Sequence, residues 1–321
     1  MLILEVVLLV EQQRLRIGTR VSPAARVHAL RVRDLLAKTL PETPVAIIPV
    51  ETPTERRVGG FASPHGRTAA KRELDRLLLS HRIDLAVHWM KEVPGDSPLP
   101  EGITFGAYLH REDVHDVAVF RAGSPYRTLA ELPAGAGVGV ASVHRCGQLL
   151  RLRPDLRVHT THGDADSQID ALDAQDGYEA VIVARSEIAR PHPPQERAVQ
   201  TLDLETMCPP IGAAAIGVAC RIDDAPLVDL LYTLDDPAAR ARVTAERALQ
   251  HGLRAHYDSP VAGHCRSLPD GRLSLRGMVF TRDGRHLVEV CEQDAANRPT
   301  RLGTRVAAAL LSRGVGALIS H

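Results

Sequence analysis

A short polar cluster at the end of an apolar run combines one of the chain's three lysines with a carboxylate and the only tryptophan. Residues 84–94 read DLAVHWMKEVP, so a buried strand leads directly into a group that includes Lys91 and Glu92. Lysine is rare here, because Lys38 and Lys71 are the only other lysines among 39 basic residues. A lysine amine is a compact donor whose pKa its surroundings can tune. The cluster therefore favours a ligand site with a tunable proton donor, although a solvated ion pair at a strand end would give the same pattern.

The preceding sequence predicts the elements that position this cluster. A strand at 15–19 is followed by Ser22-Pro23, an N-cap with proline at the first helical position, and then by a helix with one apolar face. An apolar run at 45–50 predicts a central parallel strand, and a helix at about 69–79 leads back to the cluster. This order predicts a parallel sheet with the cluster at its ligand-binding edge. Residues 51–67, rich in Gly and Pro, predict a mobile loop or lid.

The strand and helix pattern then partly restarts and later changes. Strands at 105–109, 117–120, 138–140, 158–160 and 180–184, with helices at 142–153 and 165–172, predict a second α/β unit. The last hundred residues differ, with a long helix, two strands around an Asp-Gly hairpin turn, and a closing helix. These elements are expected at 237–250, 273–280, 286–292 and 302–312. The fold class is therefore α/β with a small α+β C-terminal domain.

Length, charge and cysteine spacing narrow the functional classes. The 321 residues suffice for two or three domains, and a formal charge of zero gives no broad attraction to nucleic acid or anionic membranes. No apolar run is long enough to span a bilayer, so a cytoplasmic protein is expected. The five cysteines are scattered and lack a C-x-x-C pair, which argues against disulfides and a metal site and predicts small buried side chains. They are Cys146, Cys208, Cys220, Cys265 and Cys291.

Several motifs, in order along the chain, resemble those of one enzyme family. Residues 84–94 resemble the D-[IL]-A-[VI]-H-S-x-K-D-[VL]-P signature of porphobilinogen deaminases, also called hydroxymethylbilane synthases. The other matching segments are 16–25, 111–116, 211–221 and 243–248. The resemblance implies two hinged α/β domains similar to periplasmic binding proteins, followed by the α+β domain. It divides the chain into domain 1 (1–103 and 200–221), domain 2 (104–199) and domain 3 (222–321).

The resemblance also implies a reaction and roles for particular residues. The family joins four porphobilinogen units head to tail on a dipyrromethane primer, releasing one ammonia per step through a cationic azafulvene. Glu92 stands where the family has the aspartate that stabilises this cation, and Lys91 is the second expected catalytic residue. Glutamate keeps the charge but moves it outward by one methylene. The family's anion-binding positions correspond to Arg20, Ser22, Ser142, Arg145 and Arg190.

Other family arginines are replaced in this chain. Histidines stand at or near their positions, at His144, His159 and His162, and they predict either a polar substrate pocket or a new metal or proton-transfer cluster. No pattern supplies a fourth ligand, so the pocket interpretation is preferred and no metal is expected. Tyr257 stands where the family's primer-attaching cysteine should be, and a phenol cannot form that thioether. No cofactor is therefore expected, and Trp89, a serine in the family, is expected to fill the primer's space.

These departures leave three hypotheses. The preferred one is a repurposed enzyme that keeps Arg20, Lys91, Glu92 and Arg190 to act on a small anionic pyrrole or amine-bearing acid without polymerising it. The first alternative is an authentic hydroxymethylbilane synthase, and the second is a non-catalytic small-molecule binder. In each case the expected partner is a small anionic molecule and the expected state is a monomer.

Overall fold

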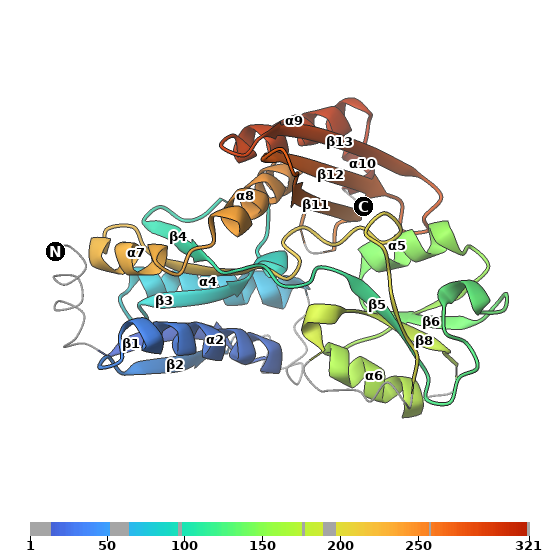
Figure 1. The fold of residues 1–321 in the computed structure, drawn as a ribbon, viewed down its shortest axis with the longest axis horizontal. Helices are drawn as coiled ribbons and strands as arrows, with labels where there is room; N and C mark the ends of the chain where they lie inside the picture. Colours follow the sequence, from blue (N-terminus) through green and yellow to red (C-terminus); the bar gives the residue numbers. More distant parts are fainter. Residues whose placement is uncertain are drawn as a thin grey trace. The chain divides into compact units, whose positions relative to one another are not determined.

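The computed structural model describes residues 14–51, 64–95, 98–174, 177–188, 197–256 and 258–319, with the backbone alone at 64–68. The chain forms two compact units. The first contains residues 1–111 and 214–243, and the second contains residues 112–213 and 244–321. Figure 1 shows the elements of both units.

The first unit is built on a mixed five-stranded sheet in the order β2-β1-β3-β10-β4. Strand β1 is parallel to both of its neighbours, whereas β10 is antiparallel to β3 and β4. The strands span Leu15–Arg20 (β1), Val45–Val50 (β2), Leu85–Trp89 (β3), Ile103–Tyr108 (β4) and Ile216–Arg221 (β10). Because β1 and β3 run in the same direction, their carboxyl ends meet at one edge of the sheet.

Helices cover both faces of this sheet (Figure 1). Alternate strand residues point to opposite faces, so Leu85 and Val87 pack with helices α2 and α7, whereas Ala86 packs with α4. The Ser22 side chain caps α2 by accepting a hydrogen bond from the Ala25 N–H. These helices span Pro23–Thr39 (α2), Pro64–Leu79 (α4) and Ala225–Tyr232 (α7).

The second unit contains another five-stranded sheet with the same pattern of strand directions. Its order is β7-β6-β8-β5-β9, in which β6 is parallel to both of its neighbours and β5 is antiparallel to β8 and β9. Helix α5 packs on one face and α6 on the other. The elements are Asp116–Phe120 (β5), Gly137–Val140 (β6), Arg157–Thr160 (β7), Ala180–Ala184 (β8), Val199–Thr201 (β9), Val143–Leu152 (α5) and Ala165–Ala174 (α6).

An antiparallel sheet, β11-β12-β13, completes the second unit. A tight turn joins the last two strands, and Gly284 adopts φ +71° there, as expected of the Asp-Gly pair. Glu246 of α8 is fully buried and accepts hydrogen bonds from the Gly212 and Cys265 N–H groups at 2.9 and 2.8 Å. Helix α8 (Pro237–Gly252) begins in the first unit and continues into the second. The other elements are Val261–Ser267 (β11), Arg272–Phe280 (β12), Leu287–Ala295 (β13), Pro299–Ser312 (α9) and Gly316–Ile319 (α10).

The predicted fold class is confirmed, since two α/β sheets are followed by a small antiparallel sheet with helices. The prediction of a loop up to residue 67 is wrong at its end, because α4 begins at Pro64, and the rest of that segment lies outside the described residues. Strand β11 and helix α7 were not expected. The three-domain boundaries stay a prediction. In the part of the chain that the structure describes, no helix is long and apolar enough to cross a membrane.

Candidate active site

A pocket lies at the edge of the first sheet where β1 and β3 end. Its wall comes from the end of β1, the first turn of α2, helix α4 and the segment after β3. Ala24, Ala25, Leu74, Val87 and Val93 form its apolar part. Its polar and aromatic residues are Arg20, Ser22, His28, Lys71, His88, Trp89 and Glu92.

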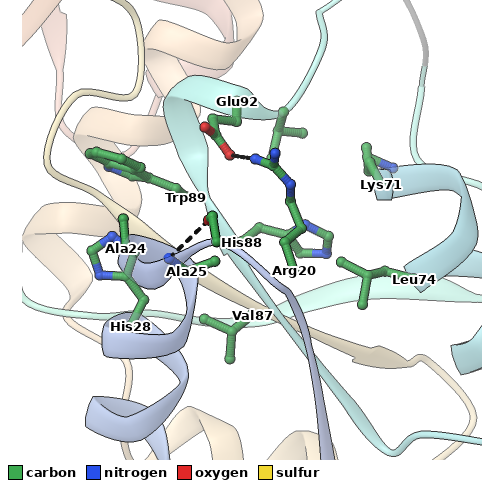
Figure 2. A pocket seen from close by; sticks show the side chains of 12 residues that line it. Arg20, Ala24, Ala25, His28, Lys71, Leu74, Val87, His88, Trp89 and Glu92 are labelled. Carbon is green, nitrogen blue, oxygen red and sulfur yellow. Dashed lines mark hydrogen bonds and ion pairs between the residues drawn. The ribbon is translucent and has the colours of Figure 1, made fainter. Parts of the chain in front are cut away.

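Arg20 and Glu92 form an ion pair in this pocket. Arg20 is the last residue of β1, and Glu92 lies in the single helical turn Met90–Glu92 that follows β3. Figure 2 shows the two side chains pointing toward one another, joined by a dashed line. The side chains are 11% and 20% exposed, so the pair is largely shielded but still reaches the pocket. Parallel pairing of β1 with β3 thus brings together two residues predicted from separate motifs.

Ser22 adds a helix N-terminus to the pocket wall. Its Oγ accepts a hydrogen bond from the Ala25 N–H at 3.3 Å and caps the 17-residue helix α2. The backbone N–H groups at a helix N-terminus favour an anion, and Arg20 lies two residues before the cap. Arg20 and the start of α2 therefore form an arrangement suited to a carboxylate.

Trp89 brings aromatic surface to the same wall. Its ring packs edge to face against His28, with 5.0 Å between centroids, and both residues line the pocket. The Nζ atom of Lys91 lies 3.8 Å from the centre of the Trp89 ring, a cation–π contact. Lys91 thus reaches the edge of the site through Trp89, whereas Glu92 lines the pocket itself.

Lys71 is a pocket residue that the sequence analysis did not identify. It lies in α4, is 7% exposed, and pairs with Asp75 at 2.5 Å. The sequence did contain a signal. Lys71 and Asp75 are four residues apart, so they lie on one helix face, and Leu74 and Leu78 on that side of α4 are buried in the core.

Arg145, expected to bind substrate, lies in the second unit, where it forms a buried pair with Asp116. Its guanidinium donates to both carboxylate oxygens at 2.8 and 2.9 Å, and the two residues are 4% and 1% exposed. His144 precedes it in α5 and is also buried. The Ser142 Oγ is buried at the start of α5 without a hydrogen-bond partner among the described residues.

Two further predicted site residues, His159 and His162, have different surroundings. His159 packs against Tyr178 with 5.1 Å between ring centroids, and His162 is exposed. Among the residues that the structure describes, no group of His, Cys, Asp and Glu could hold a metal ion. Arg190 and Tyr257 lie outside the described residues.

The five cysteines differ in their surroundings. Cys208, Cys220 and Cys265 are fully buried, as predicted, but Cys146 is half-buried and Cys291 is exposed on β13. Burial raises the pKa of the Cys208 thiol to about 12 and that of Cys220 to about 11. Such thiols are poor nucleophiles near neutral pH.

Comparison with known proteins identifies relatives along nearly the whole chain. Residues 15–229 match the porphobilinogen deaminase dipyrromethane cofactor-binding domain, and residues 240–312 match the C-terminal domain of the same enzyme. Porphobilinogen deaminase 2 of Streptomyces coelicolor is 39% identical over 95% of this chain and 96% of its own length. The porphobilinogen deaminases of Desulforudis audaxviator (35%; 95% and 96%) and Syntrophobacter fumaroxidans (33%; 96% and 97%) are also similar.

A solved structure also matches, at a lower level. The periplasmic VFT2 domain of Bordetella pertussis BvgS is 17% identical, with a TM-score of 0.41 over 70% of this chain and 90% of that domain.

These comparisons correct two expectations. The repurposed enzyme is the wrong preferred reading, because the full-length relatives named above are all porphobilinogen deaminases, which favours the alternative. The expectation of no cofactor is also wrong, because the matched region is the family's dipyrromethane cofactor-binding domain. Both expectations gave too much weight to single replaced positions such as Tyr257. Together, the two family domains and the full-length relatives show that this chain belongs to the porphobilinogen deaminase family.

Proposed function

We propose that the protein is a porphobilinogen deaminase that joins porphobilinogen units into hydroxymethylbilane. The observation that carries this proposal is the Arg20–Glu92 pair, which places a carboxylate and an anion-binding guanidinium in one pocket. In each step, a bond forms between the aminomethyl carbon of one unit and a pyrrole carbon of the next. The carbon–nitrogen bond of the aminomethyl group breaks and the nitrogen leaves as ammonia, while the pyrrole carbon that is joined loses its hydrogen as a proton.

Glu92 is the residue that acts on the reacting ring. Loss of ammonia leaves positive charge spread over the pyrrole, and a fixed carboxylate beside the ring N–H lowers the energy of that cation. Arg20 holds Glu92 in place and, with the N-terminus of α2, offers donors to a carboxylate arm of the substrate. Lys91, held over Trp89, adds a second positive charge at the edge of the site.

The donor set of the pocket fits the acid arms of a dipyrromethane cofactor. Arg20 and the first turn of α2 are the groups that would hold those arms. When bound, the cofactor supplies the pyrrole carbon to which the first unit is joined. We also propose that no cysteine anchors it at the family's usual position, because Tyr257 stands there and the three core thiols are buried.

The other predicted residues keep their proposed roles in the second unit. Ser142, the N-cap residue of α5, corresponds to Ser22, the N-cap residue of α2, because β6 and β1 hold the same place in two sheets with the same pattern of strand directions. Arg145 lies in the first turn of α5 and is proposed to contribute positive charge there. His144, His159, His162 and Arg190 of the second unit are also proposed to bind substrate. A monomeric, cytoplasmic protein is also proposed.

The test is turnover of porphobilinogen by the purified full-length chain. We expect consumption of porphobilinogen, release of one ammonia per unit, and a product that gives uroporphyrin absorbance after acid and oxidation. Intact-mass analysis of the same preparation measures whether a dipyrromethane is covalently attached. A preparation that consumes no porphobilinogen, even after preincubation with it, would overturn the proposed function.

A further inference from the structure

A buried lysine and aspartate pair forms part of the pocket wall. The Nζ of Lys71 lies 2.5 Å from the Asp75 Oδ2, and their side chains are 9% and 6% exposed. Lysine and aspartate are almost never fully buried unless they are paired. Lys71 nevertheless lines the same pocket as Arg20 and Glu92, and Figure 2 shows it entering from α4.

The same helix offers a comparison. Arg76 and Glu73 of α4 also form an ion pair, but their side chains are 62% and 34% exposed. An exposed pair costs little to form, whereas a buried pair must offset the loss of hydration of both charges. Apolar residues at the positions of Lys71 and Asp75 would serve stability as well or better. The buried pair is therefore better explained by what the ammonium faces than by helix stability.

The hydrogen bonding of the pair leaves capacity for a ligand. An ammonium has three N–H donors, and Asp75 is the hydrogen-bond partner of Lys71 within the described residues. The second Asp75 oxygen, Oδ1, is buried without a partner in the same part of the chain. Asp75 thus compensates the lysine charge and fixes its position, while two donors remain for an acceptor in the pocket.

We propose that Lys71 is a substrate-positioning residue that binds one carboxylate arm of a pyrrole dicarboxylic acid, with Asp75 holding its ammonium in place. This inference rests on the proposed function. The pocket wall carries two cations, Arg20 and Lys71, and one anion, Glu92. Porphobilinogen carries two carboxylate arms and one ammonium group, so the charges on the wall complement those of the substrate. Each cation then binds one arm, which fixes the ring relative to Glu92.

The chain contains its own reporter for this binding. Trp89 is the only tryptophan, and it lines the same pocket as Lys71. Its fluorescence therefore measures ligand binding without requiring turnover. The titration uses the full-length protein and three pyrroles, namely porphobilinogen and two analogues in which one arm, acetate or propionate, is a neutral amide.

Lys71→Met is expected to weaken porphobilinogen binding tenfold to about a hundredfold, the usual effect of losing a hydrogen bond to a charged group. Lys71→Arg should recover part of the affinity. One of the two amide analogues should bind wild type and Lys71→Met equally, because the arm that Lys71 contacts is already neutral. Lys38→Met is the matched control, since Lys38 is exposed on α2 and its loss should change the affinity less than twofold.

The outcomes separate the inference from the proposed function. Equal affinity of wild type and Lys71→Met for porphobilinogen would overturn the role of Lys71, as would an equal loss with both amide analogues. If Lys71→Met does not fold, the double variant Lys71→Met/Asp75→Leu removes both charges and should fold with the same loss of affinity. Binding of porphobilinogen without turnover would refute the proposed function and still decide the role of Lys71.

Discussion

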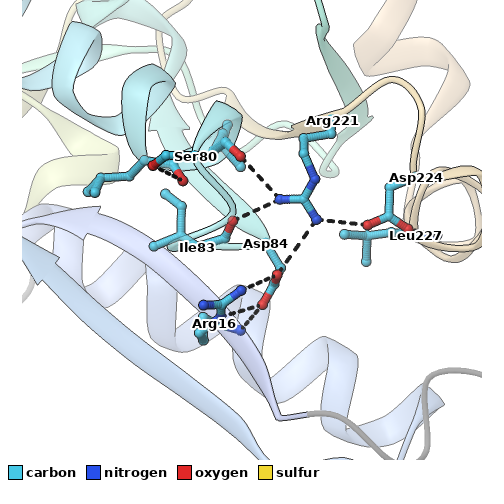
Figure 3. Close-up of polar contacts among 9 residues, drawn as sticks. Arg16, Ser80, Ile83, Asp84, Arg221, Asp224 and Leu227 are labelled. Atoms are coloured by element: carbon cyan, nitrogen blue, oxygen red, sulfur yellow. Dashed lines mark hydrogen bonds and ion pairs between the residues drawn. The ribbon is translucent and has the colours of Figure 1, made fainter.

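The two ends of the first sheet carry arginine–carboxylate pairs on the same two strands, but the pairs differ in what surrounds them. At the start of β1 and β3, Arg16 donates to both Asp84 oxygens at 2.8 and 3.0 Å, and the Arg16 N–H adds a third bond at 2.9 Å. Arg221 of β10 approaches Asp84 to 3.7 Å (Figure 3). At the other end, Arg20 and Glu92 lie in a pocket.

The two ends differ in the groups that accept hydrogen bonds from the arginines. Arg221 is buried, and it donates to the Leu78 and Ile83 carbonyls and to Asp224. The start of the sheet is thus a closed network that joins β3, β10 and the end of α4. The Arg20–Glu92 pair instead shares its pocket with a helix N-terminus, an aromatic ring and a second cation. Under the proposed function, one end of the sheet contributes stability and the other binds a ligand, although both use the same residue types.

The largest effect on stability is expected from replacing Arg221, at the closed end of the sheet, with methionine. The variant leaves two carbonyls and two carboxylates without their buried donor, so the free energy of unfolding should fall by about 3–5 kcal/mol. Urea unfolding measures this value, and Arg285→Met, at a residue 82% exposed, is the control expected to change it by less than about 0.5 kcal/mol. A loss below about 1 kcal/mol would show that the network is not structural.

Glu92→Gln, at the pocket end, is expected to reduce activity and to leave stability nearly unchanged. Removing the charge that stabilises the pyrrole cation should lower kcat by a factor of about 10²–10³. The free energy of unfolding should change little, because the amide can still accept a hydrogen bond from Arg20. Steady-state porphobilinogen consumption measures kcat, and Glu42→Gln, an exposed residue before β2, is the matched control. An unchanged kcat would remove Glu92 from the reaction.

Protonation of Asp84 at low pH should lower the free energy of unfolding, because it weakens the network at the closed end of the sheet. Burial raises the pKa of Asp84, but the hydrogen bonds and charge of Arg16 and the charge of Arg221 lower it by more, so it lies below its ordinary value of 3.8. The unfolded chain then takes up the proton first. The stability from Asp84 is complete above the unfolded-state pKa and is lost as pH falls through the lower, folded-state pKa.

Asp84→Asn removes this contribution at every pH. The variant should lose about 1.5–3 kcal/mol of unfolding free energy at pH 7, the usual value for hydrogen bonds to a charged group. As the pH falls below about 4, the free energy of unfolding of the variant should decrease less steeply than that of wild type. Urea unfolding at several pH values measures both effects, and parallel pH profiles for the two proteins would contradict the assignment.

Several regular elements of the first unit could be predicted from sequence because they depend on local signals. Ser22-Pro23 marks the start of α2, and the apolar run at 45–50 becomes β2. The pairing of Arg20 with Glu92 depends on the register of the parallel strands β1 and β3, which the order of strands and helices does not specify. Lys71 was missed because its burial depends on how α4 packs, and helical spacing alone does not distinguish a buried pair from a solvated one.

Arg145 shows a second limit. The family motif indicated a substrate cation, which stays a prediction, but the motif gave no sign of its buried bidentate pair with Asp116. A motif indicates the residue type at a position but not the residue with which it pairs. The partner of Arg145 is Asp116 of β5, which lies outside the motif. Function was misjudged for a related reason. Replaced positions such as Tyr257 were weighed one by one, whereas family membership depends on the whole chain.

The smallest effects should come from a matched pair of conservative changes on one strand. Arg16→Lys and Arg20→Lys alter residues four apart on β1, where alternate side chains share a face. Lysine keeps the charge but loses the forked geometry, so each change should cost about 1 kcal/mol at its own end. For Arg16→Lys the cost should appear in unfolding free energy, with KM unchanged. For Arg20→Lys it should appear as a roughly fivefold to tenfold rise in KM for porphobilinogen.

This pair of variants decides whether the two ends differ in function or only in exposure. If exposure alone mattered, both changes would affect stability, and the larger loss would come from Arg20, whose side chain is 11% exposed against 36% for Arg16. If the pocket binds a carboxylate arm, replacing Arg20, the more buried arginine, should raise KM and change stability little. Urea unfolding and steady-state kinetics on the two proteins therefore give opposite rankings under the two explanations.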